Sequence, residues 1–246
     1  MRALALALLA TVLIAQEAPA PRPVVLQTGS ASITVTVKDQ EVPAPRPIKL
    51  PAPSIGSVTL EKALKERQSN RNLTGPALSL NTLSQLLWSA QGENRPGTGD
   101  RPGRRTVPSA SGRYPLELYV VVTKSNELAD GVYKYSPKDH SITKVKDGGP
   151  DVIFKSARQA WIPSSPAVFI FAGVHSRLNS RDLAYGERYT FWESGAASQA
   201  LLMTIAANGL GATVVAGIDL KAVQAAAGLT DEEVISVVIP VGRIGN

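Results

Sequence analysis

The feature that most restricts the fold is the apolar run PAVFIFAGV, which covers residues 166–174. A run of this length, free of charge and rich in Val, Ile and Phe, is typical of a strand buried inside a sheet. Further strands are expected at residues 116–123, 131–135 and 141–145, and in the segments ATVVAGI (212–218) and VISVVIPVG (234–242). Helical segments are interleaved with these strands without a regular βαβ repeat, so the sequence predicts an α+β fold.

The helical segments are indicated by apolar residues at a spacing of three and four. Thr59 opens one segment, with Leu60 and Leu64 on one face, and Ser79 opens a second segment that ends near Gly92. Thr and Ser at these positions are typical of helix N-caps. Further helices are expected near residues 151–160, at 184–208 and at 219–227.

The first twenty residues have the composition of a secretory signal peptide. One Arg is followed by an apolar run from Ala3 to Ala15 and then by small residues, with Ala18-Pro19-Ala20 as a plausible cleavage site. The run is shorter than the roughly 20 residues that span a bilayer. We therefore predict a signal peptide at 1–20 and an exported protein, periplasmic or secreted; an uncleaved apolar tail is the alternative.

Two further segments follow the predicted leader. Residues 21–57 form a Pro-rich arm with one alternating stretch, SITVTVKD (32–39), that is expected to be a strand, and residues 58–246 form the main domain. The chain has no Cys, so no disulfide holds the fold and a hydrophobic core must do so.

The chain is basic, with a net charge of +6 and a pI near 9.6. Much of the positive charge is Arg in the Gly/Pro-rich loop 92–114, which has few aromatic side chains on which bases could stack. This pattern favours a small anionic ligand over nucleic acid. Two alternatives stay open for Arg104 and Arg105: one of them reaches such a ligand, or they are solvated loop arginines.

The usual catalytic motifs are missing from the sequence. It has two His and no Cys, which disfavours a metal site, and His140 and His175 are expected to be ordinary loop residues. It also lacks a G-x-S-x-G elbow, an S-x-x-K pair and a phosphate-binding P-loop. Because no side chain offers obvious reactivity, the chemistry is expected to come from a bound cofactor.

Several motifs, in order along the chain, resemble the nitroreductase-like flavoprotein superfamily. KERQSNRNL (65–73) is similar to its opening R-x-S-x-R segment. RTVPSASGRYPLELYVV, GVYKY, the long segment YGERYTFWESGAASQALLMTIAANGLGA and the closing IPVGR resemble the branch of SagB/ThcOx-type dehydrogenases. The resemblance covers about residues 50–243. It implies a nitroreductase-like α+β fold, with a mixed, mainly antiparallel sheet flanked by helices and a long buried central helix, in a homodimer.

The same resemblance implies that FMN is bound in a cleft at the dimer interface. Arg67, Ser69 and Arg71 are then expected on the phosphate side, Gln68 near the ring and Arg243 at the phosphate. Guanidinium groups suit a phosphate because their planar fork donates paired hydrogen bonds. The remaining expected cofactor contacts are Pro108, Ser109 and Ala110 against the ring, Ala216 and Gly217 facing flavin N5, and Gln199.

The chain departs from this branch at positions linked to proton transfer. Azoline oxidases of the branch carry a Lys-Tyr pair, but here Ala184 stands where the Lys would be and only Tyr185 remains as a candidate catalytic residue. The G-H-a-a-Q-N segment reads GAASQA and keeps only Gln199. Glu193 is expected to be structural. We therefore predict an FMN-dependent oxidoreductase with ping-pong electron or hydride transfer to an unassigned small-molecule or peptide acceptor, and with an undetermined electron donor.

Two alternatives remain open at this point. The first is a flavin-binding protein with a degenerate site and no turnover, and the second is basic adhesion to an anionic polymer. The long segment 184–208 is apolar or small nearly all round, with Trp192 and Ala196 among its residues, which favours burial of the helix in a homodimer.

Overall fold

The computed structural model describes residues 23–28, 31–36, 44–99, 101–178 and 184–245, in two units that divide after Ala44. In the first unit, β1 (Pro23–Thr28) and β2 (Ala31–Thr36) pair as an antiparallel hairpin, which confirms the strand expected at 32–39 as far as it is described. The predicted signal peptide lies outside the described residues. No helix in the described ranges is both long and apolar enough to cross a membrane.

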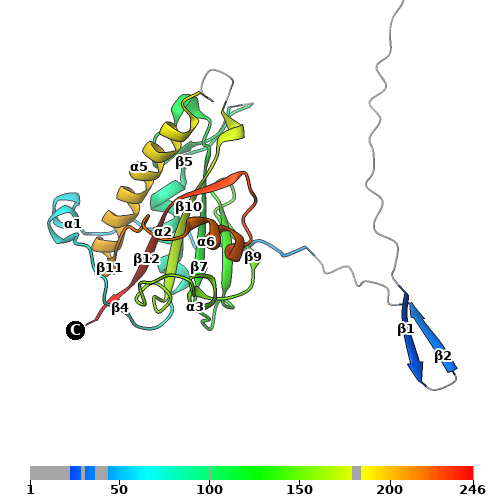
Figure 1. Cartoon of the computed structure of the whole chain (residues 1–246). Coiled ribbons are helices and arrows are strands. Elements are labelled where there is room, and N and C mark those ends of the chain that lie inside the picture. The colour runs from blue at the N-terminus through cyan, green and yellow to red at the C-terminus, as the bar shows by residue number, and fades with distance from the viewer. Residues whose placement is uncertain (1–22, 29–30, 37–43, 100, 179–183, 246) are drawn as a thin grey trace, which may run out of the picture. The chain divides into compact units, whose positions relative to one another are not determined.

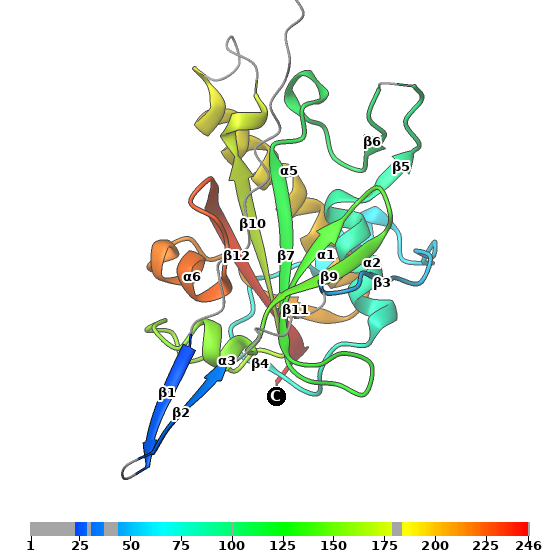
Figure 2. The same cartoon turned by 90° about the vertical axis from the view of Figure 1, so that its right-hand side faces the viewer.

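The second unit is built on an eight-stranded sheet (Figures 1 and 2). Its order is β11-β12-β10-β7-β8-β9-β3, and β4 pairs with β12 beside this path. Every pairing between these strands is antiparallel. The strands are β3 (Ile48–Lys49), β4 (Leu73–Thr74), β7 (Leu116–Val122), β8 (Gly131–Ser136), β9 (Ser141–Lys146), β10 (Ala167–Val174), β11 (Leu210–Ala212) and β12 (Glu233–Ile244).

Helices cover both faces of this sheet. Figures 1 and 2 show α1 (Leu60–Glu66), α2 (Leu80–Gln91) and α5 (Gly186–Ala207) on one face, and α3 (Pro150–Ile153) and α6 (Leu220–Ala227) on the other. Alternate residues of each central strand therefore enter two separate cores: Phe169 packs on the α2/α5 side and Ile170 on the α3/α6 side. Two-sided burial removes the polar positions that an exposed face would need, which explains the continuous apolar runs.

The helix starts are those expected from the sequence. The Thr59 side chain accepts a hydrogen bond from the Lys62 N–H, and Ser79 does the same for Thr82. Asp219 caps α6 in the same way, and Gly228 ends it in the left-handed conformation. The predicted α+β class and the helices that open at Thr59 and Ser79 are confirmed.

Three expectations are corrected by the structure. The helix expected near 151–160 is only α3, because Phe154 and Ile162 turn into the core around it. The strand expected at 212–218 ends at Ala212, after which Val215 makes a single bridge to Val238 before α6 begins. The loop 92–114 contains the paired strands β5 (Glu93–Arg95) and β6 (Arg104–Arg105) and the short helix η1 (Ala110–Gly112).

The last part of the Pro-rich arm, from Pro45 on, belongs to the second unit. Ile48 pairs with Ile142, Leu50 is buried, and the Leu50 N–H donates to the His140 carbonyl at 3.0 Å. The His140 ring lies between Tyr135 Oη at 2.8 Å and the Pro51 carbonyl at 2.9 Å. His140 is thus a hydrogen-bonded loop residue, as expected.

The long helix α5 lies close to β10 at Gly173. A Cβ atom at Gly173 would stand 2.1 Å from Cγ2 of Thr190 on α5. Real Cβ atoms do not approach so closely, so this glycine sets the distance between helix and sheet. The position of α5 decides where Glu193 and the residues around it lie.

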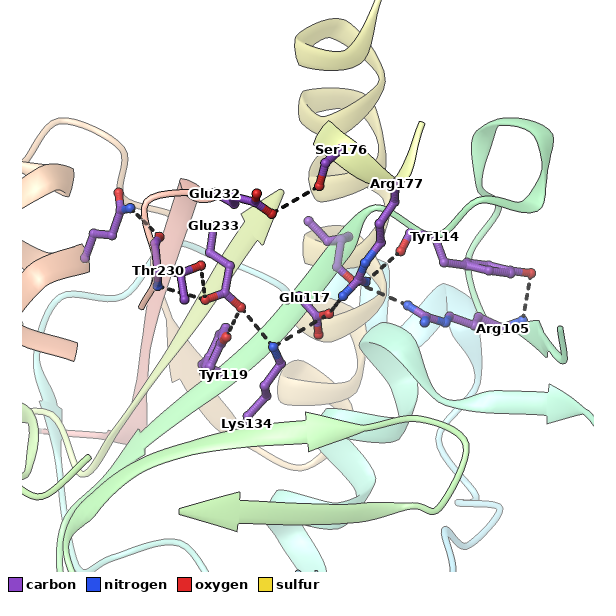
Figure 3. Close-up of polar contacts among 12 residues, drawn as sticks. Arg105, Tyr114, Glu117, Tyr119, Lys134, Ser176, Arg177, Thr230, Glu232 and Glu233 are labelled. Atoms are coloured by element: carbon purple, nitrogen blue, oxygen red, sulfur yellow. Dashed lines mark hydrogen bonds and ion pairs between the residues drawn. The ribbon is translucent and has the colours of Figure 1, made fainter. Parts of the chain in front are cut away.

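A row of charged and phenolic side chains crosses one end of the sheet (Figure 3). The short helix η2 (His175–Arg177) supplies Arg177, which pairs with Glu117 of β7. Lys134 of β8 lies 3.7 Å from Glu117 and 2.9 Å from Glu233 of β12. Tyr119 donates a hydrogen bond to Glu233. Two buried carboxylates therefore tie four chain segments together.

The neighbouring groups of this row shift the pKa values of Glu233 and Tyr119. Burial alone would raise the pKa of Glu233, but hydrogen bonds from Lys134, Tyr119 and Thr230 outweigh it and lower that pKa to about 2. Burial raises the pKa of Tyr119, and its hydrogen bond to Glu233 adds to the rise. Glu233 is thus a carboxylate that the folded chain holds ionised.

The depressed pKa predicts an acid-dependent loss of stability. Because the folded pKa lies below the ordinary value, ionised Glu233 stabilises the fold fully above about pH 5 and loses this effect as the pH falls toward 2. We expect the free energy of unfolding in urea to fall by about 1–3 kcal/mol between pH 6 and pH 3 through this group. Glu233→Gln should remove that part of the fall.

Glu232→Gln is the matched control, since Glu232 is an exposed neighbour that loses the same charge. This control should keep the pH dependence of the parent protein. If Glu233→Gln also kept it, the ionised Glu233 would not be the source of acid sensitivity.

Candidate functional site

The segment that carries Arg67, Gln68, Ser69 and Arg71 follows α1 and is fixed against β11. Ser69 forms a parallel bridge with Ala212, and the Asn70 N–H donates to the Ala212 carbonyl at 2.9 Å. The Thr213 hydroxyl donates to the Asn70 carbonyl at 2.6 Å. These backbone contacts set the segment, while the side chains of Gln68, Ser69 and Arg71 stay exposed.

Arg243 is brought to the same end of the unit by β12. It pairs with Thr74 of β4, and a Cβ atom at the neighbouring Gly75 would lie 3.1 Å from Cδ of Arg243. Figure 1 shows α1, β4 and β11 side by side at this end. Arg67 and Gln68 also line a small hollow with Ile205, in the last turns of α5. The residues predicted for the phosphate side therefore lie at the same end of the second unit.

The turn Pro108–Ala110 is held by a buried carboxylate of α5. Glu193 accepts hydrogen bonds from the Ser109 hydroxyl at 2.9 Å and from the Ala110 N–H at 2.8 Å. Ser109 Oγ in turn accepts from the Tyr114 N–H at 2.8 Å. Burial raises the pKa of Glu193, and these two hydrogen bonds oppose the rise. Glu193 thus positions the turn, as its expected structural role requires.

The other predicted site residues lie on exposed surfaces. Tyr185 precedes α5 and is 47% exposed, with its ring 6.0 Å from that of Tyr189. Gln199 is exposed on the outer face of α5. Ala216 and Gly217 are exposed in the loop between β11 and α6, and a Cβ atom at Gly217 would meet nothing within 4 Å.

One copy of the chain does not bring all these residues together. The turn at Pro108–Ala110 contacts α5 at Glu193, whereas Arg67 and Gln68 lie beside Ile205. Ile205 follows Glu193 by twelve positions in α5, which is a rise of about 18 Å along the helix. The phosphate-side residues and the ring-side turn thus lie at well-separated points along one helix.

The outer face of α5 next to Glu193 is apolar and open. Phe191 is 53% exposed and Trp192 is 72% exposed, although large aromatic side chains normally bury most of their surface. The buried face carries the polar residues Glu193, Ser194 and Ser198 together with apolar residues such as Leu201 and Ile205. Within one copy, the helix therefore lacks the burial on several sides that its sequence predicts.

Sequence reasoning missed a cavity of about 950 Å³ beside the row of charges. Arg105, Glu117, Lys134 and Arg177 line it, together with Tyr114. Arg105 is half-buried, whereas Arg104 is exposed. A signal was present in the sequence, because Glu117, Lys134 and Glu233 interrupt otherwise apolar strands. Charged residues are seldom buried unless they are paired, so such interruptions point to a polar cluster.

The described residues offer no metal centre. In these ranges no three His, Cys, Asp or Glu side chains gather as a metal ligand set.

Comparison with known proteins identifies the family. The sequence model of the nitroreductase family matches residues 64–243, which is more than half of the chain. A protein of Methanocaldococcus jannaschii named "Putative nitroreductase" is 34% identical over 165 residues, or 66% of this chain and 81% of the relative.

Solved structures agree with this match. A crystal structure of a protein with the same description, from Ralstonia eutropha, aligns with a TM-score of 0.70 at 26% identity and covers 85% of this chain and 97% of its own. The microcin synthetase McbBCD complex of E. coli aligns with a TM-score of 0.62 at 19% identity over 85% of this chain and 80% of that chain, which shows a shared fold. The expected nitroreductase-like α+β fold is confirmed, and the chain belongs to the nitroreductase family of oxidoreductases.

Proposed function

We propose that the chain is an FMN-dependent oxidoreductase of the SagB/ThcOx-type branch that binds the flavin between two copies of itself. The observation that carries the proposal is the separation of the predicted phosphate and ring residues by about 18 Å along α5. The exposed aromatic side chains Phe191 and Trp192 lie on the same helix, next to Glu193. A second copy packed on this face would bury Trp192 and bring its own turn toward the first copy's arginines.

The phosphate-side residues fit an anionic group. Among the described residues, no carboxylate lies within ion-pair distance of Arg67, Arg71 or Arg243. Three guanidinium groups without a local counter-ion favour a phosphate, because charge-assisted hydrogen bonds to phosphate are stronger than neutral ones. Ser69, beside them, would supply a hydroxyl.

The ring-side residues fit a flat ligand. Pro108, Ser109 and Ala110 are small, and Glu193 fixes their backbone. The open space at Gly217 allows a ligand to approach the backbone of Ala216 and Gly217. Gln199, on the outer face of α5, is the remaining candidate contact.

Bound FMN would supply two-electron transfer between a donor and an acceptor. The chain's own residues would hold the phosphate through Arg67, Arg71 and Arg243, and would orient the ring through the turn that Glu193 positions. Tyr185 is the candidate for proton transfer to the acceptor, since its exposed hydroxyl can reach a bound molecule.

A second candidate function is flavin binding without turnover. It is favoured by Ala184, which replaces the Lys expected beside Tyr185. An enzyme's flavin should bleach without air when a donor is added and recover its colour with an acceptor, whereas a storage protein's flavin should not cycle.

We also propose that the protein is exported, on the basis of the sequence of residues 1–20. Reduced nicotinamides are scarce outside the cytoplasm, so the donor would then be another reductant or the substrate itself. The acceptor is a small molecule or a peptide.

The phosphate assignment predicts a selective effect of Arg71→Ala. Loss of one charge-assisted contact is worth roughly 1.5–3 kcal/mol, so FMN should bind about ten- to a hundredfold more weakly. Riboflavin lacks the phosphate and should bind the variant as it binds the parent. Titration of both flavins by fluorescence quenching measures the difference, and equal losses for the two ligands would remove the assignment.

The ring-side assignment predicts a different pattern for Glu193→Ala. Without the carboxylate, the Ala110 N–H and Ser109 hydroxyl lose their acceptor, at a cost of about 1–3 kcal/mol. FMN and riboflavin should weaken together, by about five- to a hundredfold. Glu193→Gln keeps an acceptor oxygen and should restore most of the affinity. A loss for FMN alone would show that Glu193 does not support the ring side.

A further inference from the structure

We propose that the 950 Å³ cavity beside the charged row binds a small aromatic carboxylate, with Arg105 as its anchor. The cavity lies between the β5–β6 hairpin, the first residues of β7, the end of β8 and η2. It is distinct from the predicted flavin contacts, none of which lines it. The proposal therefore stands on this cavity alone and does not require flavin chemistry.

The guanidinium of Arg105 is held in place but has no carboxylate partner. Its Nη1 donates to Gln91 Oε1 at 2.6 Å and to the Leu116 carbonyl at 3.3 Å, and the group lies 4.4 Å from the centre of the Tyr114 ring. Among the described residues, Nη2 and Nε make no hydrogen bond, and Arg105 is in no ion pair. These two nitrogens form one edge of the planar fork, which suits a carboxylate.

The charges around the cavity leave an excess of positive charge. Five cations line it against two carboxylates, Glu93 and Glu117. Glu117 is already shared by Arg177 and Lys134, as Figure 3 shows. Burial lowers the pKa of Arg105, and the negative charges of Glu117 and Glu193 oppose this effect only in part. A bound carboxylate would compensate part of this excess positive charge.

The walls of the cavity favour a ligand with a flat apolar body. Pro96, Pro102 and Pro137 line it, together with Tyr135 and Val145. Pyrrolidine rings and a phenol offer apolar surfaces, and ligand sites commonly combine such surfaces with a few fixed polar groups. An aromatic ring that carries a single carboxylate meets both requirements.

Tyr114 fixes the aromatic surface on which Arg105 rests. Its φ of 50° is in the left-handed region, which is unusual for a bulky residue. The conformation is held by the hydrogen bond from its N–H to Ser109 Oγ, and its hydroxyl accepts from the Arg105 N–H at 3.4 Å. Strained residues of this kind gather at ligand sites.

The test uses phenylacetate, with 2-phenylethanol as the neutral probe of similar size. Isothermal titration of the full chain, without added flavin, should show binding of phenylacetate and at least about tenfold weaker binding of 2-phenylethanol. Equal affinity for acid and alcohol, or no binding of the acid, would overturn the proposal.

Variants assign the binding to this cavity. Arg105→Gln should weaken phenylacetate by about tenfold or more, and Arg105→Lys should recover only part of it, because an ammonium lacks the planar fork. Arg158→Gln is the control: it removes the same charge from an exposed arginine that does not line the cavity. An unchanged affinity in Arg105→Gln, or an equal loss in the control, would contradict the proposal.

Two further measurements keep the test decisive. Lys138 is an exposed residue of the cavity wall, so Lys138→Gln should fold even if Arg105→Gln does not, and should weaken phenylacetate about two- to fivefold. The acid should bind equally well when FMN is present in excess. Competition by FMN would place the acid in the flavin site and overturn this proposal, while failure of FMN to bind at all would leave the phenylacetate result intact.

Discussion

The constraint on which the structure depends is the burial of one antiparallel sheet on both faces. The side chains in the middle of strands such as β7 and β10 cannot contact a ligand, because they are packed in the two cores. Polar chemistry is therefore confined to strand ends and the loops between them. The arginines after α1, the turn at Pro108–Ala110 and the cavity around Arg105 all lie at such places.

Charged side chains that do enter the interior each tie separate elements together. Glu193 joins α5 to the turn at Ser109 and Ala110. Glu233 joins β12 to β7 and β8 through Tyr119 and Lys134. Because a buried carboxylate is costly unless its hydrogen bonds are complete, each of these contacts fixes the geometry of a loop or strand end. The proposed flavin and carboxylate sites both rely on loops fixed in this way.

Several strands and helix starts could be predicted from the sequence, because their signals are local. The runs at 116–123 and 166–174 and the caps at Thr59 and Ser79 are local signals, and the structure follows them. The segment 212–218 has the pattern of a strand, but only Ala212 and Val215 are paired, because pairing depends on residues that are distant in the sequence. The partners of Arg105 could not be predicted from the sequence either, because Gln91, Leu116 and Tyr114 contact it only through tertiary packing.

The central claim is that each flavin site uses residues from two copies of the chain, and subunit complementation tests it most directly. One chain would carry Arg67→Ala and Arg71→Ala, the other Ala110→Trp, and differently tagged chains would be co-expressed and purified as the mixed dimer. Each variant alone should bind almost no FMN. The mixed dimer has one intact site, so it should hold one FMN for two chains, about half of the parent's loading. A mixed dimer as empty as its parents would mean that the site is built within one copy, which contradicts the account.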